Sequence, residues 1–239
     1  MERGLEKKRP LAELTNVFKN KAVRYAPYKH FLLLLYWPLF LAVFKLAESG
    51  VFTKAYHLVQ CPLDEGIPFC EYFVVPYVLW FLFVGGMAAY TVFFEKKAFV
   101  RYMSFIMITY TAALIAFFLF PTVQQLRPSV FTEPNLFTGM VIGIYSMDTN
   151  TNVCPSVHVI GQIAVLLAAF DCKRFAHRLW KIFFIIATIA VCASTVFIKQ
   201  HSILDVFAAL AVCLPAYFFV YRKTNRSVLG KESFSCPKP

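Results

Sequence analysis

The chain has 239 residues, of which 59% are hydrophobic and only 15% are charged, and 27 of them are phenylalanine. About a quarter of the residues of a soluble domain are charged, so this composition excludes an ordinary soluble globular protein. The net charge of +11 can report membrane topology, so it does not by itself indicate a nucleic-acid partner. We therefore expect a polytopic membrane protein.

Six apolar segments approach the roughly 20 residues that a helix needs to cross a bilayer. Together they predict an all-α fold, with six transmembrane helices in one bundle spanning residues 31–222. Residues 1–30 are charged and lack an apolar core, so we expect no cleavable signal peptide. The fourth segment is the shortest. The six segments are Phe31–Ala47, Phe73–Phe94, Phe99–Phe120, Val157–Phe170, Ile182–Ile198 and Ile203–Tyr221.

The basic residues predict the orientation. Most of the 24 lysines and arginines lie in residues 1–30, between the second and third segments, between the fourth and fifth, and in residues 223–239. The positive-inside rule then places both terminal tails in the cytoplasm. The loops on the opposite, extracytoplasmic side are then residues 48–72, 121–156 and 199–202. Apolar residues recur at helical spacing within residues 1–30. These residues therefore form either a basic amphipathic helix on anionic lipid or a mobile charged tail.

The seven cysteines do not form a disulfide framework. A bond between Cys61 and Cys70 is possible in an oxidising exterior, but free thiols are the favoured prediction. No cysteines or histidines have zinc-ligand spacing, so we expect neither a metal nor another cofactor. Gly85, Gly86 and Gly161 lie in predicted spans, and we expect them to permit close helix packing.

Two histidine motifs begin predicted spans at the same membrane face. His158 stands in the stretch NVCPSVHV at the start of the fourth segment, and His201 and Asp205 stand at the start of the sixth. Ionisable residues at membrane depth are costly and rare. Two such motifs at one depth therefore predict a shared site at the outer interface.

The residue types of these motifs fit phosphoryl transfer. His201 and Asp205 are four residues apart on one helix face, so the carboxylate can orient the imidazole as a nucleophile. His158 can protonate the leaving oxygen, and the guanidinium of Arg127 can pair with phosphate oxygens. Singly, each residue has an ordinary structural explanation, such as a carboxylate at a helix N-terminus; their joint occurrence favours a site.

The same residues resemble the motifs of the type 2 phosphatidic acid phosphatase superfamily of membrane lipid phosphatases and phosphotransferases. That pattern has three blocks: lysine, six residues and Arg-Pro; Pro-Ser-x-His; and Ser-Arg, five residues, His, three residues and Asp. The resemblance covers the third to sixth segments and their loops. The matching residues are Arg127, Pro128, Pro155, Ser156, His158, Ser194, His201 and Asp205.

The resemblance implies a role for each matched residue. His201 is the expected nucleophile, Asp205 its orienting partner, and His158 the acid for the leaving group and then the base for the acceptor. The expected substrate is a membrane lipid, processed at the extracytoplasmic side. The expected phosphate-binding residues, with Lys199 as a partial substitute for a missing cation, are Arg127, Ser156, Ser194 and Lys199.

Two cations of the family pattern are missing. Phe120 stands at the lysine position of the first block and Thr195 at the arginine position of the third. A phosphate monoester is close to a dianion at neutral pH and a diester is a monoanion, so the loss affects a monoester more. The absence of the arginine from the third block resembles the pattern of one branch of the superfamily, which contains inositol phosphorylceramide synthase and sphingomyelin synthase. Headgroup transfer or hydrolysis of a phosphodiester lipid is therefore favoured over a monoester phosphatase.

An alternative hypothesis from a different functional class is that the protein is a non-catalytic membrane scaffold or lipid transporter. The two missing cations favour it, but a transporter would place its polar residues near the bilayer midplane. Other polar residues of the outer loops could contact a headgroup or be merely solvated. Solvation is the favoured prediction for the acidic ones and is equally good for the amides. These residues are Asp64, Glu65, Glu71, Gln124, Gln125, Asn150 and Asn152.

Overall fold

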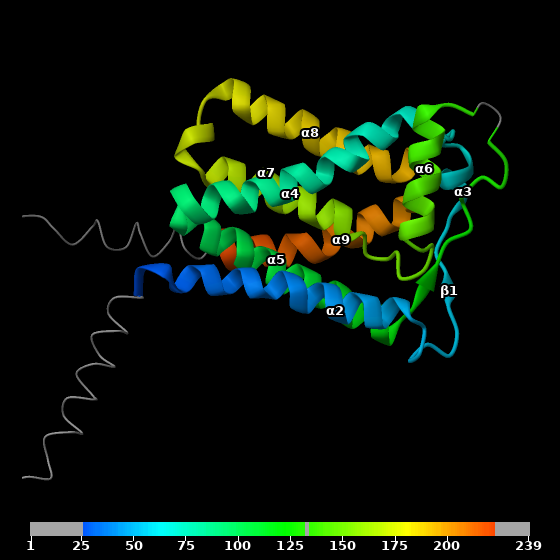
Figure 1. Ribbon diagram of the computed structural model, residues 1–239, viewed down its shortest axis with the longest axis horizontal. Coiled ribbons are helices and arrows are strands. Elements are labelled where there is room, and N and C mark those ends of the chain that lie inside the picture. The colour runs from blue at the N-terminus through cyan, green and yellow to red at the C-terminus, as the bar shows by residue number, and fades with distance from the viewer. Residues whose placement is uncertain (1–25, 132–133, 223–239) are drawn as a thin grey trace, which may run out of the picture.

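The computed structural model describes residues 26–131 and 134–222, and its long helices lie side by side along the longest dimension of the molecule (Figure 1). The first is η1 (Ala26–Leu35), which continues into α2 (Tyr36–Glu48). The others are α4 (Val74–Phe94), α5 (Lys96–Leu119), α7 (Val157–Asp171), α8 (Arg178–Phe197) and α9 (Ile203–Tyr217), which continues into η4 (Phe218–Arg222). The predicted tails, 1–30 and 223–239, lie almost entirely outside the described residues.

Smaller elements gather at one end of this bundle. Helix α6 (Leu136–Met147) runs across that end and packs against α4 (Figure 1). Helix α3 (Pro62–Glu65) lies at the same end, as does the strand β1 (His57–Leu58), which pairs in parallel with β2 (Thr122–Val123). The short helices η2 (Glu71–Phe73) and η3 (Lys173–Phe175) precede α4 and α8. Neither α6 nor the strand pair is predicted by the hydropathy pattern, because twelve apolar residues are too few for a span.

Five helices of the described chain are long and apolar enough to cross a membrane. They contain the first, second, third, fifth and sixth predicted segments, so the predicted helical, multi-pass architecture is confirmed at that level. The fourth segment is α7, which has 15 residues and is about 22 Å long, shorter than the roughly 30 Å hydrocarbon layer. The spanning helices are Tyr28–Glu48, Glu71–Phe94, Lys96–Leu119, Arg178–Phe197 and Ile203–Arg222.

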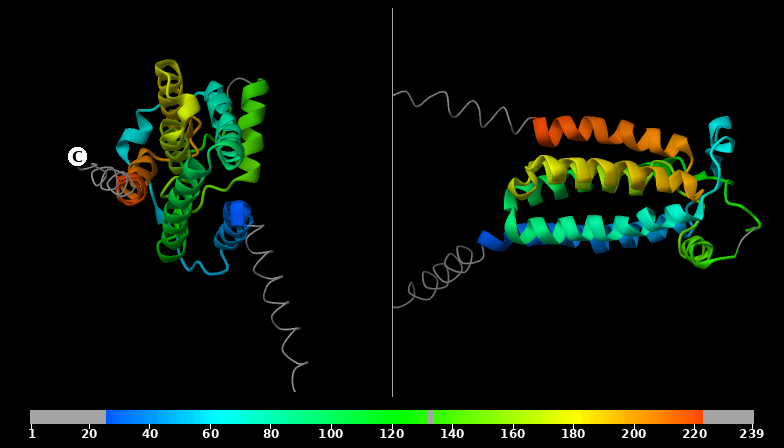
Figure 2. Two further views of the ribbon diagram at one scale, coloured as in Figure 1. Left: turned by 90° about the vertical axis from the view of Figure 1, so that its left-hand side faces the viewer. Right: turned by 90° about the horizontal axis from the view of Figure 1, so that it is seen from above.

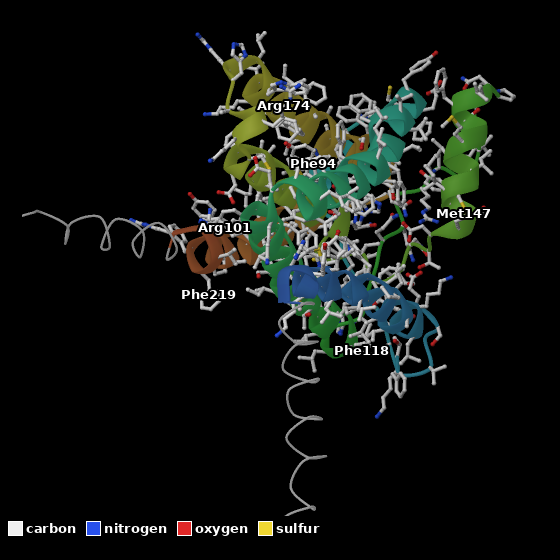
Figure 3. All side chains as sticks on the ribbon, turned by 60° about the vertical axis from the view of Figure 1, so that its left-hand side comes forward. Phe94, Arg101, Phe118, Met147, Arg174 and Phe219 are labelled. Carbon is white, nitrogen blue, oxygen red and sulfur yellow. The ribbon has the colours of Figure 1, made fainter. Side chains whose placement is uncertain are left out.

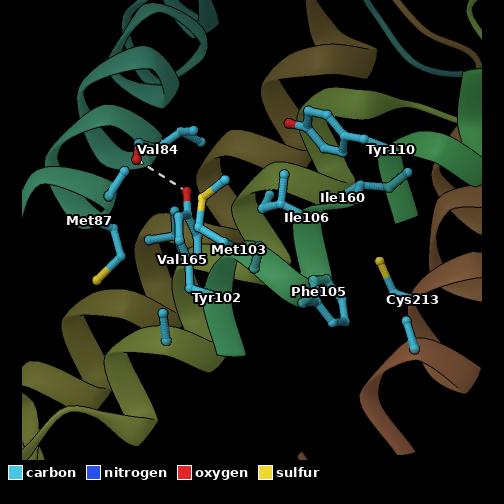
Figure 4. Close-up of a cluster of buried hydrophobic side chains, with 14 of the residues drawn as sticks. Val84, Met87, Tyr102, Met103, Phe105, Ile106, Tyr110, Ile160, Val165 and Cys213 are labelled. Carbon is cyan, nitrogen blue, oxygen red and sulfur yellow. Dashed lines mark hydrogen bonds between the residues drawn. The ribbon is translucent and has the colours of Figure 1, made fainter. Parts of the chain in front are cut away.

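Helix α7 is the centre of the bundle and packs against α4, α5, α8 and α9. Ile160 and Val165 of α7 are fully buried against Phe105 and Ile106 of α5 (Figure 4). In the same cluster, the Tyr102 hydroxyl donates a hydrogen bond to the carbonyl of Val84, 3.1 Å away. Most of α7 is therefore buried among other helices, and Phe170 near its end is exposed.

Large apolar side chains cover the outside of the bundle. Leu82, Phe94, Ile186 and Phe219 are all exposed, and Figure 3 shows Phe94 and Phe219 pointing outward. A soluble monomer rarely exposes apolar area so continuously. The outer surface therefore fits contact with lipid chains.

The two ends of the bundle differ in charge. Residues 26 and 222 lie at the same end (Figure 2), where Arg101 and Arg174 are also found, whereas Met147 lies at the other end (Figure 3). Arg101 forms an ion pair with Asp171, the last residue of α7. This pair fixes one end of α7 to α5, and the histidine motifs lie at the opposite end.

The three span glycines have different surroundings. A Cβ atom on Gly161 would lie 2.6 Å from the Tyr110 hydroxyl and 2.9 Å from the Trp80 ring, so α7 approaches these rings only because the residue is glycine. At Gly85 and Gly86 a Cβ atom would meet nothing within 4 Å. The expected close packing is found at Gly161 and is wrong for the other two.

Gly161→Ala should therefore destabilise the bundle. The added methyl group overlaps the Tyr110 hydroxyl and Trp80, and such overpacking costs about 1–3 kcal/mol. Thermal unfolding of the purified protein in detergent measures the effect. Gly86→Ala is the matched control, and its melting temperature should be unchanged or slightly higher because alanine favours the helix. Equal melting temperatures for the two variants would contradict the close contact.

Candidate functional site

His201 and Asp205 form a buried pair at the start of α9. His201 is 5% exposed and Asp205 is 0% exposed, and Nδ1 of His201 lies 3.1 Å from Oδ2 of Asp205. The same carboxylate oxygen accepts the N–H of Ser202 at 3.0 Å, which completes a capping box at the helix N-terminus. With Nδ1–H donated to Asp205, the free lone pair of the imidazole is on Nε2.

His158 faces this pair from the first turn of α7. Its ring centroid lies 5.7 Å from that of His201, and the side chain is 6% exposed. Two such rings can contact one phosphoryl group, because a near-attack distance is about 3–3.5 Å and a hydrogen bond about 3 Å. The ring packs against Tyr77 and Trp80, with centroids 4.5 and 4.4 Å away, and its Nδ1 has no hydrogen-bond partner.

A backbone hydrogen bond joins the two motifs. The N–H of Ser156, which caps α7, donates to the carbonyl of Asp205 at 3.2 Å. The Ser156 hydroxyl accepts the N–H of Val159 at 3.4 Å, so Ser156 is buried as a helix cap. The starts of α7 and α9 are thereby held in a fixed relation. The structure brings together the three predicted catalytic residues, His158, His201 and Asp205.

Both histidines line a cavity of about 300 Å³. A second cavity of about 540 Å³, lined by apolar side chains along η1, α2 and α4, shares Phe40, Leu41, Trp80, Phe81 and Val157 with it. The site therefore combines a partly polar chamber with an adjoining apolar groove. The polar and aromatic residues of the chamber are Tyr77, Trp80, Phe81, Phe40, Phe44, Asp148, Thr149, Thr151, Asn152, His158, Gln200 and His201.

A cysteine nucleophile is disfavoured beside these histidines. Burial, together with the neighbouring Asp205 carboxylate, raises the pKa of the Cys154 thiol to about 12. Cys154 is then a neutral thiol at neutral pH, whereas the thiolate is the nucleophile. Cys61 and Cys70 are both free thiols, as the sequence favours.

Arg127 lies behind the cavity wall. Its guanidinium donates to the carbonyls of Tyr145, Asp148 and Thr149 at 3.2, 2.8 and 2.7 Å, and to Oε1 of Gln200 at 3.0 Å. It does not belong to the residues that line the chamber. Arg127 thus holds the wall that presents Asp148 and Gln200, and its phosphate contact stays a prediction.

Lys199 also points away from the cavity. Its Nζ donates to the carbonyls of Asp64 and Ile67 at 2.6 and 2.5 Å. Burial lowers the pKa of the Lys199 ammonium, and the nearby Asp64 partly offsets this. The backbone of Lys199 is left-handed, with φ of 55°. In the structure its ammonium attaches residues 64–67 to the loop before α9, and its phosphate role stays a prediction.

Ser194, Thr195 and Phe120 also make contacts within the protein. Ser194 is fully buried, and its hydroxyl donates to the carbonyl of Val191 at 2.6 Å. The carbonyl of Thr195 accepts the N–H groups of both Gln200 and His201, at 3.0 and 2.9 Å. Phe120 stacks on His57, with ring centroids 3.9 Å apart. None of the four predicted phosphate-binding residues lines the cavity, Ser156 and Ser194 included.

Sequence reasoning misses the residues that make up the wall. Asp148, Gln200 and Tyr77 form one network, in which Asp148 Oδ2 accepts Gln200 Nε2 at 2.7 Å and the Tyr77 hydroxyl at 3.4 Å. Asn152 lines the cavity and is 4% exposed, so the alternative of a solvated loop residue is wrong for it. In the sequence, Gln200 directly precedes His201, and Asp148 lies shortly before the PSVH block. Nearness to these motifs is the sequence feature that could have indicated that the two residues belong to the site.

Asp64 is a further correction. It is not solvated but fully buried, and its carboxylate accepts the Ser202 hydroxyl at 2.6 Å, the Ile203 N–H at 2.8 Å and the Cys61 N–H at 2.8 Å. Burial raises the pKa of this carboxyl, but these three hydrogen bonds outweigh it and hold the pKa below its usual value. Asp64 thus fastens the segment around α3 to the loop that carries His201.

No family model, curated protein or solved structure matches this chain. Its function must therefore be inferred from the geometry of the site.

Asp64→Asn should lower the melting temperature at neutral pH. The carboxylate accepts three hydrogen bonds, whereas the amide of asparagine places an N–H donor at one of the two accepting positions. A buried donor left unpaired costs about 1–3 kcal/mol. Since the folded pKa is lowered, the ionised carboxylate stabilises the fold above the ordinary value of about 4. That stability is lost as pH falls through the lower folded value. Thermal unfolding of both proteins from pH 7 to pH 2 should show the gap closing in acid.

Glu65→Gln is the control for this series, because Glu65 is the exposed neighbouring carboxylate. Its melting temperature should follow that of the unaltered protein at every pH. A gap for Asp64→Asn that is absent at pH 7, or as large at pH 2 as at pH 7, would exclude the buried carboxylate as a stabilising cap.

Proposed function

We propose that this protein is an integral-membrane lipid phosphoesterase or phosphotransferase that works through a phosphohistidine. The observation that carries the proposal is the His201–Asp205 pair facing His158 across one cavity. The apolar groove that joins this cavity supports a substrate with hydrocarbon chains. Such a groove can bind the chains while the phosphate reaches the histidines.

In the first step, Nε2 of His201 attacks phosphorus and the bond from phosphorus to the lipid alcohol oxygen breaks. His158, in its protonated form, gives its proton to that oxygen, so a neutral lipid alcohol leaves. The phosphorylated imidazole is cationic, and the carboxylate of Asp205 on Nδ1 stabilises it. A buried carboxylate is effective here because water does not screen it.

In the second step, His158 takes the proton of an incoming hydroxyl group as that group attacks phosphorus. The phosphorus–nitrogen bond breaks, and His201 recovers its lone pair. Water as the acceptor gives hydrolysis, and a lipid alcohol gives transfer of the phosphate-bearing headgroup. Both outcomes use the same two histidines, because the acceptor replaces the leaving alcohol at the same position.

The charges of the site favour a phosphodiester over a monoester. Arg127 and Lys199 donate to carbonyls of the protein rather than facing the cavity. A dianionic monoester would be bound without a permanent cation from the lining residues, whereas a diester carries a single charge. Each missing charge-assisted hydrogen bond weakens binding of the more highly charged ester more strongly.

For the topology we propose six crossings with both termini in the cytoplasm. Short α7 is enclosed by four neighbouring helices, which supports a sixth crossing whose ends lie near the interface. The described ends of the chain share one end of the bundle with Arg101 and Arg174 (Figures 2 and 3). The positive-inside rule makes that end cytoplasmic, so the histidines act at the extracytoplasmic side.

His201→Ala should abolish turnover, and His158→Ala should lower kcat by about 10²–10⁴-fold, the usual contribution of general acid–base catalysis. The assay is mass spectrometry of products formed from phospholipids in mixed micelles. Intact-protein mass spectrometry after a rapid quench should detect an acid-labile phosphate adduct that His201→Ala lacks.

His57→Ala is the matched histidine control, because His57 stacks on Phe120 outside the cavity. Its turnover should equal that of the unaltered protein. Equal products from the unaltered protein and His201→Ala would exclude the enzymatic proposal and leave a scaffold or transporter.

The kcat/KM for turnover of a diester phospholipid should exceed that for release of phosphate from phosphatidic acid by about tenfold or more. This ratio corresponds to the free energy of one charge-assisted hydrogen bond that the monoester lacks in this site. The same micelles containing each lipid separately provide the comparison. A faster reaction with phosphatidic acid would show that the site binds a dianion without cations in its lining.

A further inference from the structure

The chamber around the two histidines has an unusual charge for a phosphate site. Among the described residues that line it, Asp148 is the one with a permanent charge, and that charge is negative. Glu48 lies behind the wall and accepts the Thr149 hydroxyl at 2.6 Å. A carboxylate beside an anionic phosphate is repulsive unless the ligand also carries a positive charge.

Asp148 is held in place but is not neutralised by a direct ion pair. Gln200 and Tyr77 donate to its Oδ2, whereas Arg127 donates to its backbone carbonyl and to Gln200. The ion pairs among the described residues join Arg101 to Asp171 and His201 to Asp205. Within that part of the chain the Asp148 carboxylate therefore has no direct ion-pair partner, and Arg127 acts on its charge only from behind the wall.

Asn152 supplies a second and independent observation. Its backbone is left-handed, with φ of 52°, and its Nδ2 donates to the carbonyl of Ala47 at 3.1 Å. Its Oδ1 is buried and has no hydrogen-bond partner among residues 26–131 and 134–222, and the residue lines the same chamber. A buried acceptor without a partner is unfavourable, so a ligand with an N–H or O–H donor is favoured there.

Aromatic rings complete the chamber. Tyr77, Trp80 and Phe81 come from α4, and Phe40 and Phe44 from α2. The faces of such rings attract cations, most strongly when water is excluded. A carboxylate, an unpaired amide oxygen and aromatic walls together match a small cation with N–H groups.

We infer that the headgroup of the substrate is a primary ammonium, as in a phosphoethanolamine-type lipid. This inference rests on the proposed function. With phosphorus between His201 and His158, the ammonium pairs with Asp148 and donates an N–H to Oδ1 of Asn152. A trimethylammonium headgroup has the charge but no N–H, and a glycerol headgroup has donors but no charge. A trimethylammonium group therefore matches the Asp148 carboxylate but not the Asn152 oxygen, and a glycerol group matches the oxygen but not the carboxylate.

The experiment measures kcat/KM in mixed micelles for phosphatidylethanolamine, phosphatidylcholine and phosphatidylglycerol of identical acyl chains. We expect phosphatidylethanolamine to be preferred. Asp148→Asn should lower its kcat/KM by about 10–100-fold, because hydrogen bonds to charged groups are among the stronger ones. The same variant should raise kcat/KM for phosphatidylglycerol, because it removes a negative charge beside an anionic phosphate that has no ammonium group. Asn152→Leu should reduce the preference for phosphatidylethanolamine over phosphatidylcholine.

Glu65→Gln is the matched control, since it removes a carboxylate outside the chamber, and it should leave all three rates unchanged. Ratios between lipids within one variant correct for any loss of folded protein. Equal rates for the three lipids, or ratios that Asp148→Asn does not alter, overturn the ammonium assignment while the proposed function stands. Absence of any product, with His201→Ala identical, overturns the proposed function itself.

Discussion

The structure depends above all on the contacts of Asp205. One of its carboxylate oxygens accepts hydrogen bonds from the His201 ring and from the N–H of Ser202, the N-cap of α9. Its backbone carbonyl accepts the N–H of Ser156, the N-cap of α7. One residue therefore orients the His201 ring and joins the two helix starts, which holds His201 and His158 near each other. A change at Asp205 would therefore disturb orientation, capping and the relation of the two motifs together.

A second layer of contacts keeps this centre in position. Asp64 fastens residues 61–67 to the start of α9, Lys199 fastens the same segment through its carbonyls, and Arg127 holds the segment before the PSVH block. These charged groups bind backbone and side-chain atoms of the protein. The cavity lining therefore has little positive charge, and this property is the basis of the proposed preferences for a diester and for a cationic headgroup.

The adjoining groove gives the site its relation to the bilayer. Helix α2 packs against α5, and the apolar cavity lies between the α2 and α4 side chains. In the proposed reaction the hydrocarbon chains remain in this apolar environment, while the phosphate enters a chamber with buried polar groups. Burial strengthens the electrostatic interactions of the histidines and the carboxylate, because the surrounding dielectric is low.

The sequence by itself determined the helical, membrane-spanning class and brought His158, His201 and Asp205 into one site, because apolar periodicity, helix spacing and charge distribution are local properties. It did not reveal α6, the burial of Asp64, or where the side chains of Arg127, Lys199, Ser156 and Ser194 point. Those features depend on loops distant in sequence that meet at one end of the bundle. Only the tertiary structure decided which polar groups bind each other and which, such as Asp148 and Asn152, face the cavity, because buried hydrogen-bond partners are set by packing.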